Sequence, residues 1–304
     1  MKRCVLAVLC FVVIGSGVLT LACPVFAGSS GPSVPDTSAV VGRANEYGRA
    51  VRTGELIVRT EATFLEEPDE NFTDERKIWF DGLRSRVEVR VRRPKAKEQD
   101  RRTEEYWTLF DGERAIRATP PDFERVSVTV PNDLSELPRY VAAAGRVIGD
   151  VIGPALSHSL PLGDTIAAWG GELVGEEQIQ GLWCVRLTSR AFERPKYRTV
   201  RSWWLAPDKG YALVQYSEVT TWFSGKTSAK HTVSLVDEWL HTNDGVWMPK
   251  AVSVRVYIKH RGGDLASLRR IDRIELLSAA INGPVSDEVF AVQLPEAVKQ
   301  ALTE

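Results

Sequence analysis

Hydrophobic and polar residues alternate along several stretches of the chain, as they do in half-buried β-strands. From Gly54 to Phe64 the even-numbered positions are mostly apolar, and from Arg86 to Arg92 three valines alternate with charged residues. Successive side chains of a strand point to opposite faces of its sheet, so these stretches predict a sheet with one dry face and one solvated face. Further strands are expected in the second half of the chain, at residues 172–179, 182–189, 199–205, 211–223, 229–240, 246–257 and 268–281.

Short turn sequences separate many of these stretches. Three of them contain an Asp-Gly pair: Phe80-Asp81-Gly82, Phe110-Asp111-Gly112 and Asn243-Asp244-Gly245. Asp-Gly favours a tight hairpin because both residues tolerate a positive φ angle. A fourth hairpin is expected around Gln180-Gly181. Strands joined by hairpins pair antiparallel, so the sequence predicts a meander, and the turns lack the fixed period of a solenoid or propeller.

Two segments have helical rather than strand periodicity. Residues 37–51 are expected to form a short amphipathic helix. Residues 134–169 contain a longer helix that begins at Pro138 and ends at Gly153-Pro154, followed by a short helix from Gly163 to Trp169. We therefore expect a mainly β (α+β) fold, a long curved antiparallel sheet with a helical insertion that acts as a plug or lid. The lid residues are predicted to be Tyr140, Val147 and Val151.

The N-terminus resembles an export signal. Lys2 and Arg3 precede an uncharged run from Cys4 to Ala22, and the small residue Ala27 follows at a suitable cleavage position. This pattern predicts a secretory signal peptide and a periplasmic or cell-envelope location. The apolar run is nearly as long as the roughly 20 residues that span a bilayer, so an N-terminal membrane anchor stays open as an alternative. Lipidation at Cys23 is a third reading.

Composition agrees with an exported globular domain. The chain has 304 residues, 43% of them hydrophobic and 26% charged, with a net charge of -1, so no global field attracts nucleic acid or an anionic membrane. Three of the four cysteines lie in the predicted signal peptide, which leaves Cys184 without an intramolecular disulfide partner. The expected organisation is a signal peptide (1–27), a tether with a short helix (28–53), one β domain (54–295) with its insertion at about 134–169, and a tail (296–304).

Side chains that could take part in catalysis or metal binding are scattered along the sequence. Ser157-His158-Ser159 lacks the Gly-x-Ser-x-Gly turn of a hydrolase nucleophile, and the four histidines do not form a zinc motif. One polar cluster would suit a cation if its strand end folded back, and it consists of Asp237, Glu238, His241 and Asp244. We therefore expect no catalytic residues, no cofactor, no metal and no nucleic-acid partner. A hydrolase is the least favoured of the three functions that we consider.

Four segments of the second half resemble the bacterial outer-membrane lipoprotein carrier and lipoprotein-sorting superfamily, the LolA-like proteins. The segments are Val174-Gly175-Glu176-Glu177 with Gly181-Leu182-Trp183-Cys184-Val185, Trp203-Trp204-Leu205-Ala206-Pro207-Asp208-Lys209-Gly210-Tyr211, Asp244-Gly245-Val246-Trp247-Met248-Pro249, and Phe290 with Leu294-Pro295. The resemblance implies a sheet curved into a half-barrel, with helices closing over a concave apolar face that takes up acyl chains or a lipidated partner. It covers roughly Gly54 to Pro295. This chain is longer than the compact carriers and has a larger insertion and a charged loop at 92–102, and no polar gating residue is carried over.

The predicted function is that of a periplasmic lipid- or lipoprotein-binding protein of the carrier or sorting type, without covalent chemistry. Its partner would be a lipid or a lipidated protein. The alternative is an envelope interaction or sensing module of the same fold, with an envelope protein as partner and a cleft filled by its own side chains. The predicted ligand contacts are first-half residues on the face opposite Arg86 and Arg90. They are Leu56, Val58, Phe64, Ile78, Phe80, Val87, Val89, Val91, Trp107 and Leu109.

Overall fold

The computed structural model describes residues 36–82, 84–93, 104–110, 115–118, 126–129, 162–263 and 266–291. All of these belong to one unit of the chain, Pro35–Glu304. The predicted signal peptide, the predicted lid residues Tyr140, Val147 and Val151, and the tail 296–304 lie outside the described residues. Those predictions stay predictions.

The strands of the described residues form a single antiparallel sheet of 14 strands, which confirms the mainly β fold class. The first-half strands are β1 (Thr53–Phe64), β2 (Phe72–Asp81), β3 (Arg84–Arg92), β4 (Glu104–Phe110), β5 (Ala115–Ala118) and β6 (Val126–Thr129). The second-half strands are β7 (Gly171–Ile179), β8 (Leu182–Ser189), β9 (Phe192–Arg194), β10 (Tyr197–Ala206), β11 (Ala212–Trp222), β12 (Thr227–His241), β13 (Trp247–His260) and β14 (Ser267–Ile281). The helices are α1 (Thr37–Ala50), α5 (Leu162–Ala168) and α6 (Asp287–Phe290), with the short 3-10 turns η1 (Pro68–Glu70) and η3 (Pro207–Lys209).

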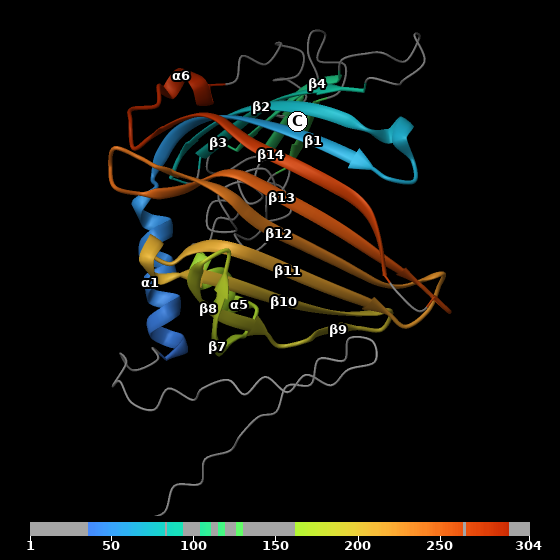
Figure 1. The fold of residues 1–304 in the computed structure, drawn as a ribbon. Helices are drawn as coiled ribbons and strands as arrows, with labels where there is room; N and C mark the ends of the chain where they lie inside the picture. Colours follow the sequence, from blue (N-terminus) through green and yellow to red (C-terminus); the bar gives the residue numbers. More distant parts are fainter. Residues whose placement is uncertain are drawn as a thin grey trace, which may run out of the picture. The chain divides into compact units, whose positions relative to one another are not determined.

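The two halves of the chain meet in the middle of the sheet. The strand order is β6-β5-β4-β3-β2-β1-β14-β13-β12-β11-β10-β8-β7, with β9 paired to β10 beside β8. Each half is a meander, and the first strand of one pairs with the last strand of the other, from Gly54 opposite Ile281 to Phe64 opposite Arg270 (Figure 1). Within the described ranges the terminal strands β6 and β7 do not pair, so the sheet is open.

The predicted turns fix the hairpins as expected. Gly82 ends the β2–β3 hairpin with φ +58°, and Gly245 ends the β12–β13 hairpin with φ +79°. Gln180 and Gly181 both have positive φ, the requirement of a type I′ turn between β7 and β8. The Asp111-Gly112 turn lies outside the described residues, but the strands on either side of it, β4 and β5, pair antiparallel.

One face of the sheet packs against α1 and α5, and we call it the helix face; the opposite side is the outer face. The helix face carries one cluster of buried apolar residues that extends from β3 to β8. Representative members are Val40, Leu56, Ile78, Val89, Leu162, Leu187, Trp203, Val254 and Ile274. The outer face carries two smaller clusters, one around Trp79, Leu109, Ile116 and Phe290 and one around Cys184 and Trp204.

The predicted helix at residues 37–51 is present as α1. Asp36 caps it by accepting a hydrogen bond from the Ala39 backbone N–H at 2.7 Å. Asn45 joins it to α5 through two hydrogen bonds with Asp164, one to the side chain at 2.7 Å and one from the backbone N–H at 2.9 Å. Gly163 lies so close to α1 that a Cβ there would be 2.0 Å from the Val41 carbonyl oxygen. Only glycine, which has no Cβ, fits this position near the start of α5.

Candidate functional site

Most of the predicted ligand contacts lie together on the helix face. Six are members of its buried apolar cluster: Leu56, Val58, Ile78, Phe80, Val87 and Val89. Val91 is partly buried and packs against the same cluster. Phe64 lies farther along β1 on the same face, where its ring is 6.4 Å from that of Phe72. The pleat of the first-half strands therefore gathers these residues as the alternation predicted.

One predicted contact does not share this face. The register of β3 and β4 pairs Leu109 with Arg86, which belongs to the opposite side of β3 from Val87 and Val89. Leu109 is buried in the outer-face cluster with Trp79, Ile116 and Phe290. The expectation that Leu109 shares a surface with Val89 is wrong, while the predicted ligand contacts themselves stay predictions. The cause is the register across the 92–103 connection, which alternation within a single strand does not specify.

The helix face also carries charged residues, which the sequence reading did not anticipate. Asp74 and Arg76 occupy positions of β2 that point to the same side as Ile78. Arg76 Nη2 lies 2.6 Å from Asp74 Oδ2, and Asp74 is only 1% exposed. On β14, Arg270 and Asp272 form a second pair on this face. The even positions of β2 already contain this signal, because polar residues interrupt an otherwise apolar row.

A third polar group lies on the helix face of β10 and β11. Arg201 Nε is 2.9 Å from Glu218 Oε2, and the Tyr216 hydroxyl donates to the same carboxylate at 3.0 Å. The Arg201 guanidinium stacks 3.7 Å from the centre of the Trp169 ring, just after α5. Burial, followed by the negative charge of Glu218, raises the pKa of Tyr216, so this hydroxyl remains a hydrogen-bond donor at neutral pH. The helix face thus combines a continuous apolar surface with three groups of paired charges.

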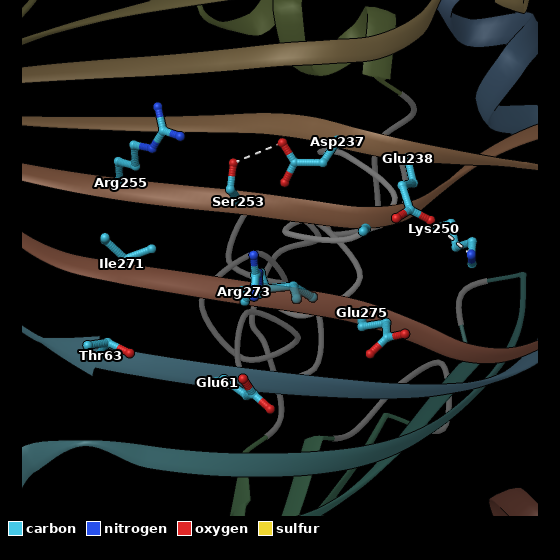
Figure 2. Close-up of a pocket in the computed structure, with 12 residues that line it drawn as sticks. Glu61, Thr63, Asp237, Glu238, Lys250, Ser253, Arg255, Ile271, Arg273 and Glu275 are labelled. Atoms are coloured by element: carbon cyan, nitrogen blue, oxygen red, sulfur yellow. Dashed lines mark hydrogen bonds and ion pairs between the residues drawn. The ribbon is translucent and has the colours of Figure 1, made fainter.

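The outer face of β1, β12, β13 and β14 is hollowed into a groove of about 760 Å³. Figure 2 shows its floor, where Ser253 donates to Asp237 at 3.2 Å and Lys250 to Glu238 at 2.9 Å. The hydrogen bond between Lys250 and Glu238 lowers the pKa of Glu238 and raises the pKa of Lys250, so both groups stay charged near neutral pH. Four acidic and three basic side chains are mixed along the groove, so its net charge is small and its attraction for ions of either sign is weak.

The polar cluster that would suit a cation if its strand end folded back does not assemble in this groove. Asp237 and Glu238 line it, whereas the exposed His241 stacks on Trp247 with ring centres 4.5 Å apart. Within the part of the chain that the structure describes, no group of three or more His, Cys, Asp or Glu side chains is placed to hold a metal ion. The Ser157-His158-Ser159 sequence lies outside the described residues.

A serine–histidine contact that the sequence reading missed occurs on the outer face. Ser217 Oγ lies 2.8 Å from His231 Nε2, and the His231 ring is 5.9 Å from that of Tyr257. Ser217 and His231 are diagonal neighbours on β11 and β12, 14 positions apart in sequence, so only the strand register brings them together. Among the described residues no carboxylate contacts the second ring nitrogen, so the orienting group of a catalytic triad is missing from this pair.

The His231 contact predicts a pH dependence of stability. Burial lowers the pKa of His231, so folding favours the neutral ring. This contribution is complete above the unfolded pKa of about 6.5 and is lost as the pH falls through the lower folded value. We expect His231→Gln to reduce the drop in melting temperature between about pH 8 and about pH 5.5, as measured by thermal unfolding. His241→Gln, at an exposed histidine, is the control. An equal drop in both variants and the native protein would contradict this prediction.

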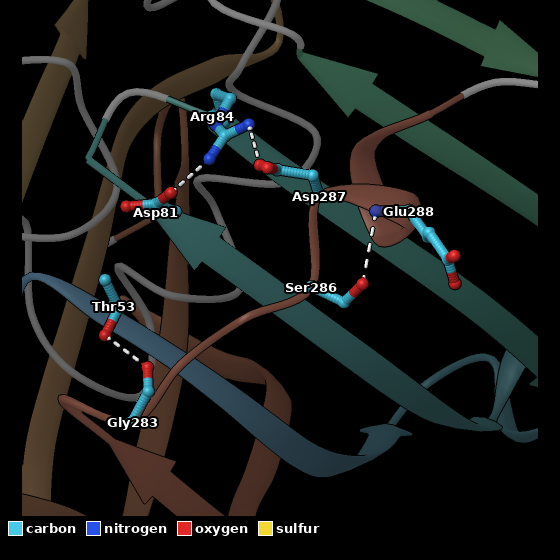
Figure 3. Close-up of polar contacts among 7 residues, drawn as sticks. All are labelled: Thr53, Asp81, Arg84, Gly283, Ser286, Asp287 and Glu288. Atoms are coloured by element: carbon cyan, nitrogen blue, oxygen red, sulfur yellow. Dashed lines mark hydrogen bonds and ion pairs between the residues drawn. The ribbon is translucent and has the colours of Figure 1, made fainter.

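The C-terminal helix α6 covers part of the outer face. Arg84 donates to Asp287 at 2.7 Å and also contacts Asp81 (Figure 3). The Arg84 guanidinium lies 4.7 Å from the centre of the Phe290 ring. Before this helix, Thr53 donates to the Gly283 carbonyl at 2.8 Å, which ties the segment to the start of β1. These contacts seat Phe290 in the outer-face cluster, so a residue of the family-like C-terminal motif serves in packing.

Comparison with known proteins adds the fold relationship. No family model matches the chain, and no curated protein matches it. A DUF1329 family protein from Desulfovibrio piger is similar in structure, with a TM-score of 0.50 and 13% identity over 85% of this chain and 98% of that one. The chain shares its fold.

Two further solved structures have somewhat lower scores. A domain named for outer membrane lipoprotein sorting, from Vibrio parahaemolyticus, has a TM-score of 0.48 and 10% identity over 88% of this chain and 100% of its own. A LolA superfamily protein from Nitrosomonas europaea has a TM-score of 0.47 and 12% identity over 85% and 99%. Both match this chain at low sequence identity. No helix in the described ranges is long and apolar enough to cross a membrane.

Proposed function

We propose that this protein is an exported carrier of the bacterial envelope, which shields the acyl chain of a lipid or lipidated protein against the apolar part of its helix face. The main support for this proposal is the single apolar cluster that extends across the open sheet from β3 to β8. Such a surface supplies affinity without catalytic groups, because each buried methylene contributes about 0.8 kcal/mol. The sequence resemblance to lipoprotein carriers supports the same role, and the export signal supports a periplasmic or envelope location.

The residues that would contact the acyl chain are the apolar side chains of β1, β2 and β3 on the helix face. Leu56, Val58 and Val89 lie on three neighbouring strands there. The Leu56–Ile78 and Ile78–Val87 pairings align their strands so that the apolar positions form rows across the sheet. The row of Leu56, Ile78 and Val87 is entirely apolar, whereas in the next row Arg76 lies between Val58 and Val89.

One observation favours a second function. Leu56, Val58 and Ile78 are each 0% exposed, so the apolar surface is already covered in this state. A cleft filled by the protein's own side chains would suit an interaction or sensing module whose partner is an envelope protein. The two functions differ in one property: a carrier opens this surface to a lipid, whereas a module keeps it packed.

A pair of tryptophan substitutions separates these functions. For a carrier, we expect Val89→Trp to fill the lipid position, weaken binding of a fluorescent fatty acid by at least about tenfold, and leave the melting temperature nearly unchanged. Leu109→Trp is the matched control, because it enlarges a buried residue of the outer-face cluster and should cost about 1 to 3 kcal/mol of stability without changing the affinity of the folded protein.

The contrary outcome is equally defined. If the cleft is a packed core, Val89→Trp should cost about 1 to 3 kcal/mol, like the control. The native protein should then bind no fatty acid, and mass spectrometry of protein purified from its own envelope should find no lipid. Those results together would replace the carrier function by the interaction module.

A further inference from the structure

The same arrangement of an arginine and an aspartate two residues apart occurs on two strands of the helix face. On β14, Arg270 and Asp272 are fully paired, with Nε–Oδ1 at 2.5 Å and Nη2–Oδ2 at 2.7 Å. On β2, Arg76 and Asp74 make one contact, Nη2–Oδ2 at 2.6 Å. Asp74 Oδ1 and Arg76 Nε are both buried and have no hydrogen-bond partner among the described residues. We call Arg270–Asp272 the closed pair. We call Asp74–Arg76, which leaves one acceptor and one donor without a partner, the open pair.

An unused buried donor and acceptor point to a ligand. A carboxylate loses its hydration on burial, and only full hydrogen bonding compensates for this. Asp74 is 1% exposed, and Arg76 keeps 18% of its side-chain surface in solvent, so the pair is buried but can be reached past the arginine. The closed pair on β14 shows that an arginine and an aspartate two residues apart on this face can satisfy each other through both carboxylate oxygens.

The open pair adjoins the fully apolar row of Leu56, Ile78 and Val87. Arg76 pairs with Val58 on β1 and with Val89 on β3, and both valines belong to the buried apolar cluster. Asp74 is one step farther out, opposite Val91. A lipid whose chain packs on Leu56, Ile78 and Val87 would bring its polar head to Arg76 in the next row and to Asp74 beyond it.

We propose that Asp74 and Arg76 bind the head group of the carried lipid, and that this head carries both an anionic oxygen and a cationic amine. The phosphate oxygen accepts a hydrogen bond from Arg76 Nε, and the ammonium donates to Asp74 Oδ1. The choice of a zwitterionic head follows from the charge of the site, because one arginine and one aspartate sum to zero and offer one group of each sign. This inference rests on the proposed carrier function and gives it a ligand class.

The test compares two ligands with the same acyl chain. Displacement of a fluorescent fatty acid is measured with lauroyl lysophosphatidylethanolamine and with methyl laurate, which has no charged head. The native protein should prefer the lysolipid by about tenfold, which corresponds to about 1.4 kcal/mol. In Asp74→Leu/Arg76→Leu the preference should fall to about one while methyl laurate still binds, because apolar residues replace a buried ion pair without leaving a lone charge.

Two further variants keep the test decisive. Asp74→Asn/Arg76→Gln removes both charges but keeps polar side chains, and it should also abolish the preference. It replaces the leucine variant if that variant does not fold. Asp272→Asn disturbs the closed pair on β14 and should keep the tenfold preference. Equal binding of both ligands by the native protein would overturn the head-group site and leave the carrier function intact. Binding of neither ligand would overturn both.

Discussion

Replacing Gly163 with alanine should separate α5 from α1 and lower the free energy of unfolding by roughly 3 to 5 kcal/mol, the range of severe core changes. The added Cβ would lie 2.0 Å from the Val41 carbonyl oxygen and 2.6 Å from Asn45 Oδ1. A backbone oxygen cannot rotate away as a side chain can, so α1 itself must move. That movement breaks the two hydrogen bonds between Asn45 and Asp164 and loosens Leu162 and Ile166 from the helix-face cluster.

Gly42 provides the matched control for this prediction. It lies inside α1, and a Cβ there would meet nothing within 4 Å. Gly42→Ala should therefore raise the free energy of unfolding by about 0.5 to 1 kcal/mol, because alanine favours the helix. Urea unfolding of both variants measures the contrast. A cost below about 1 kcal/mol for Gly163→Ala would contradict the close packing of α1 against α5.

The second large effect is expected at Trp203. Its side chain is 1% exposed in the middle of the helix-face cluster, with its ring 6.2 Å from that of Tyr216. Trp203→Ala should lower the free energy of unfolding by about 3 to 5 kcal/mol, because it leaves a large cavity between sheet and helices. The indole Nε1 has no hydrogen-bond partner among the described residues. Trp203→Phe should therefore cost less than about 1.5 kcal/mol, since it removes this unpaired donor along with part of the ring.

The adjacent Trp204 tests this account from the opposite face. Its indole donates to Glu177, and the Arg186 guanidinium lies 5.0 Å from its ring centre. Trp204→Phe loses a hydrogen bond to a charged group and should cost about 1.5 to 3 kcal/mol, more than the same change at Trp203. Thermal and urea unfolding of the two phenylalanine variants decide the order. A larger loss at Trp203 would mean that its indole N–H has a partner.

The opposite orientation of these two tryptophans follows from the sequence alone. Neighbouring residues of a strand face opposite sides, and the structure indeed buries Trp203 in the helix-face cluster and Trp204 in an outer-face cluster. The same local rules predicted the strands of the second half, the turns at Gly82 and Gly245, and the helix at residues 37–51. These features depend on residues close together in the chain, so the sequence contains the complete signal for each.

The arrangement of the strands in the sheet was decided by contacts between distant residues. The pairing of β1 with β14 joins residues more than 200 positions apart, and no local pattern marks it. The register between β3 and β4 assigns Leu109 to the outer face, and a shift by one residue would reverse that assignment. Within one strand, alternation fixes which residues share a face, but only pairing with its neighbours fixes which face that is.

The candidate site shows the same division. Apolar residues such as Leu56, Val58 and Val89 were predictable, because burial of hydrocarbon is the main driving force of folding and leaves a periodic record in the sequence. The sequence also shows Asp74 and Arg76 in the apolar row of β2, but it does not show that their pairing is incomplete. That property depends on atomic distances within the folded sheet, as does the contact of Gly163 with Val41. Sequence periodicity thus determined which surfaces are apolar, and tertiary packing decided which buried polar groups on them lack a hydrogen-bond partner among the described residues.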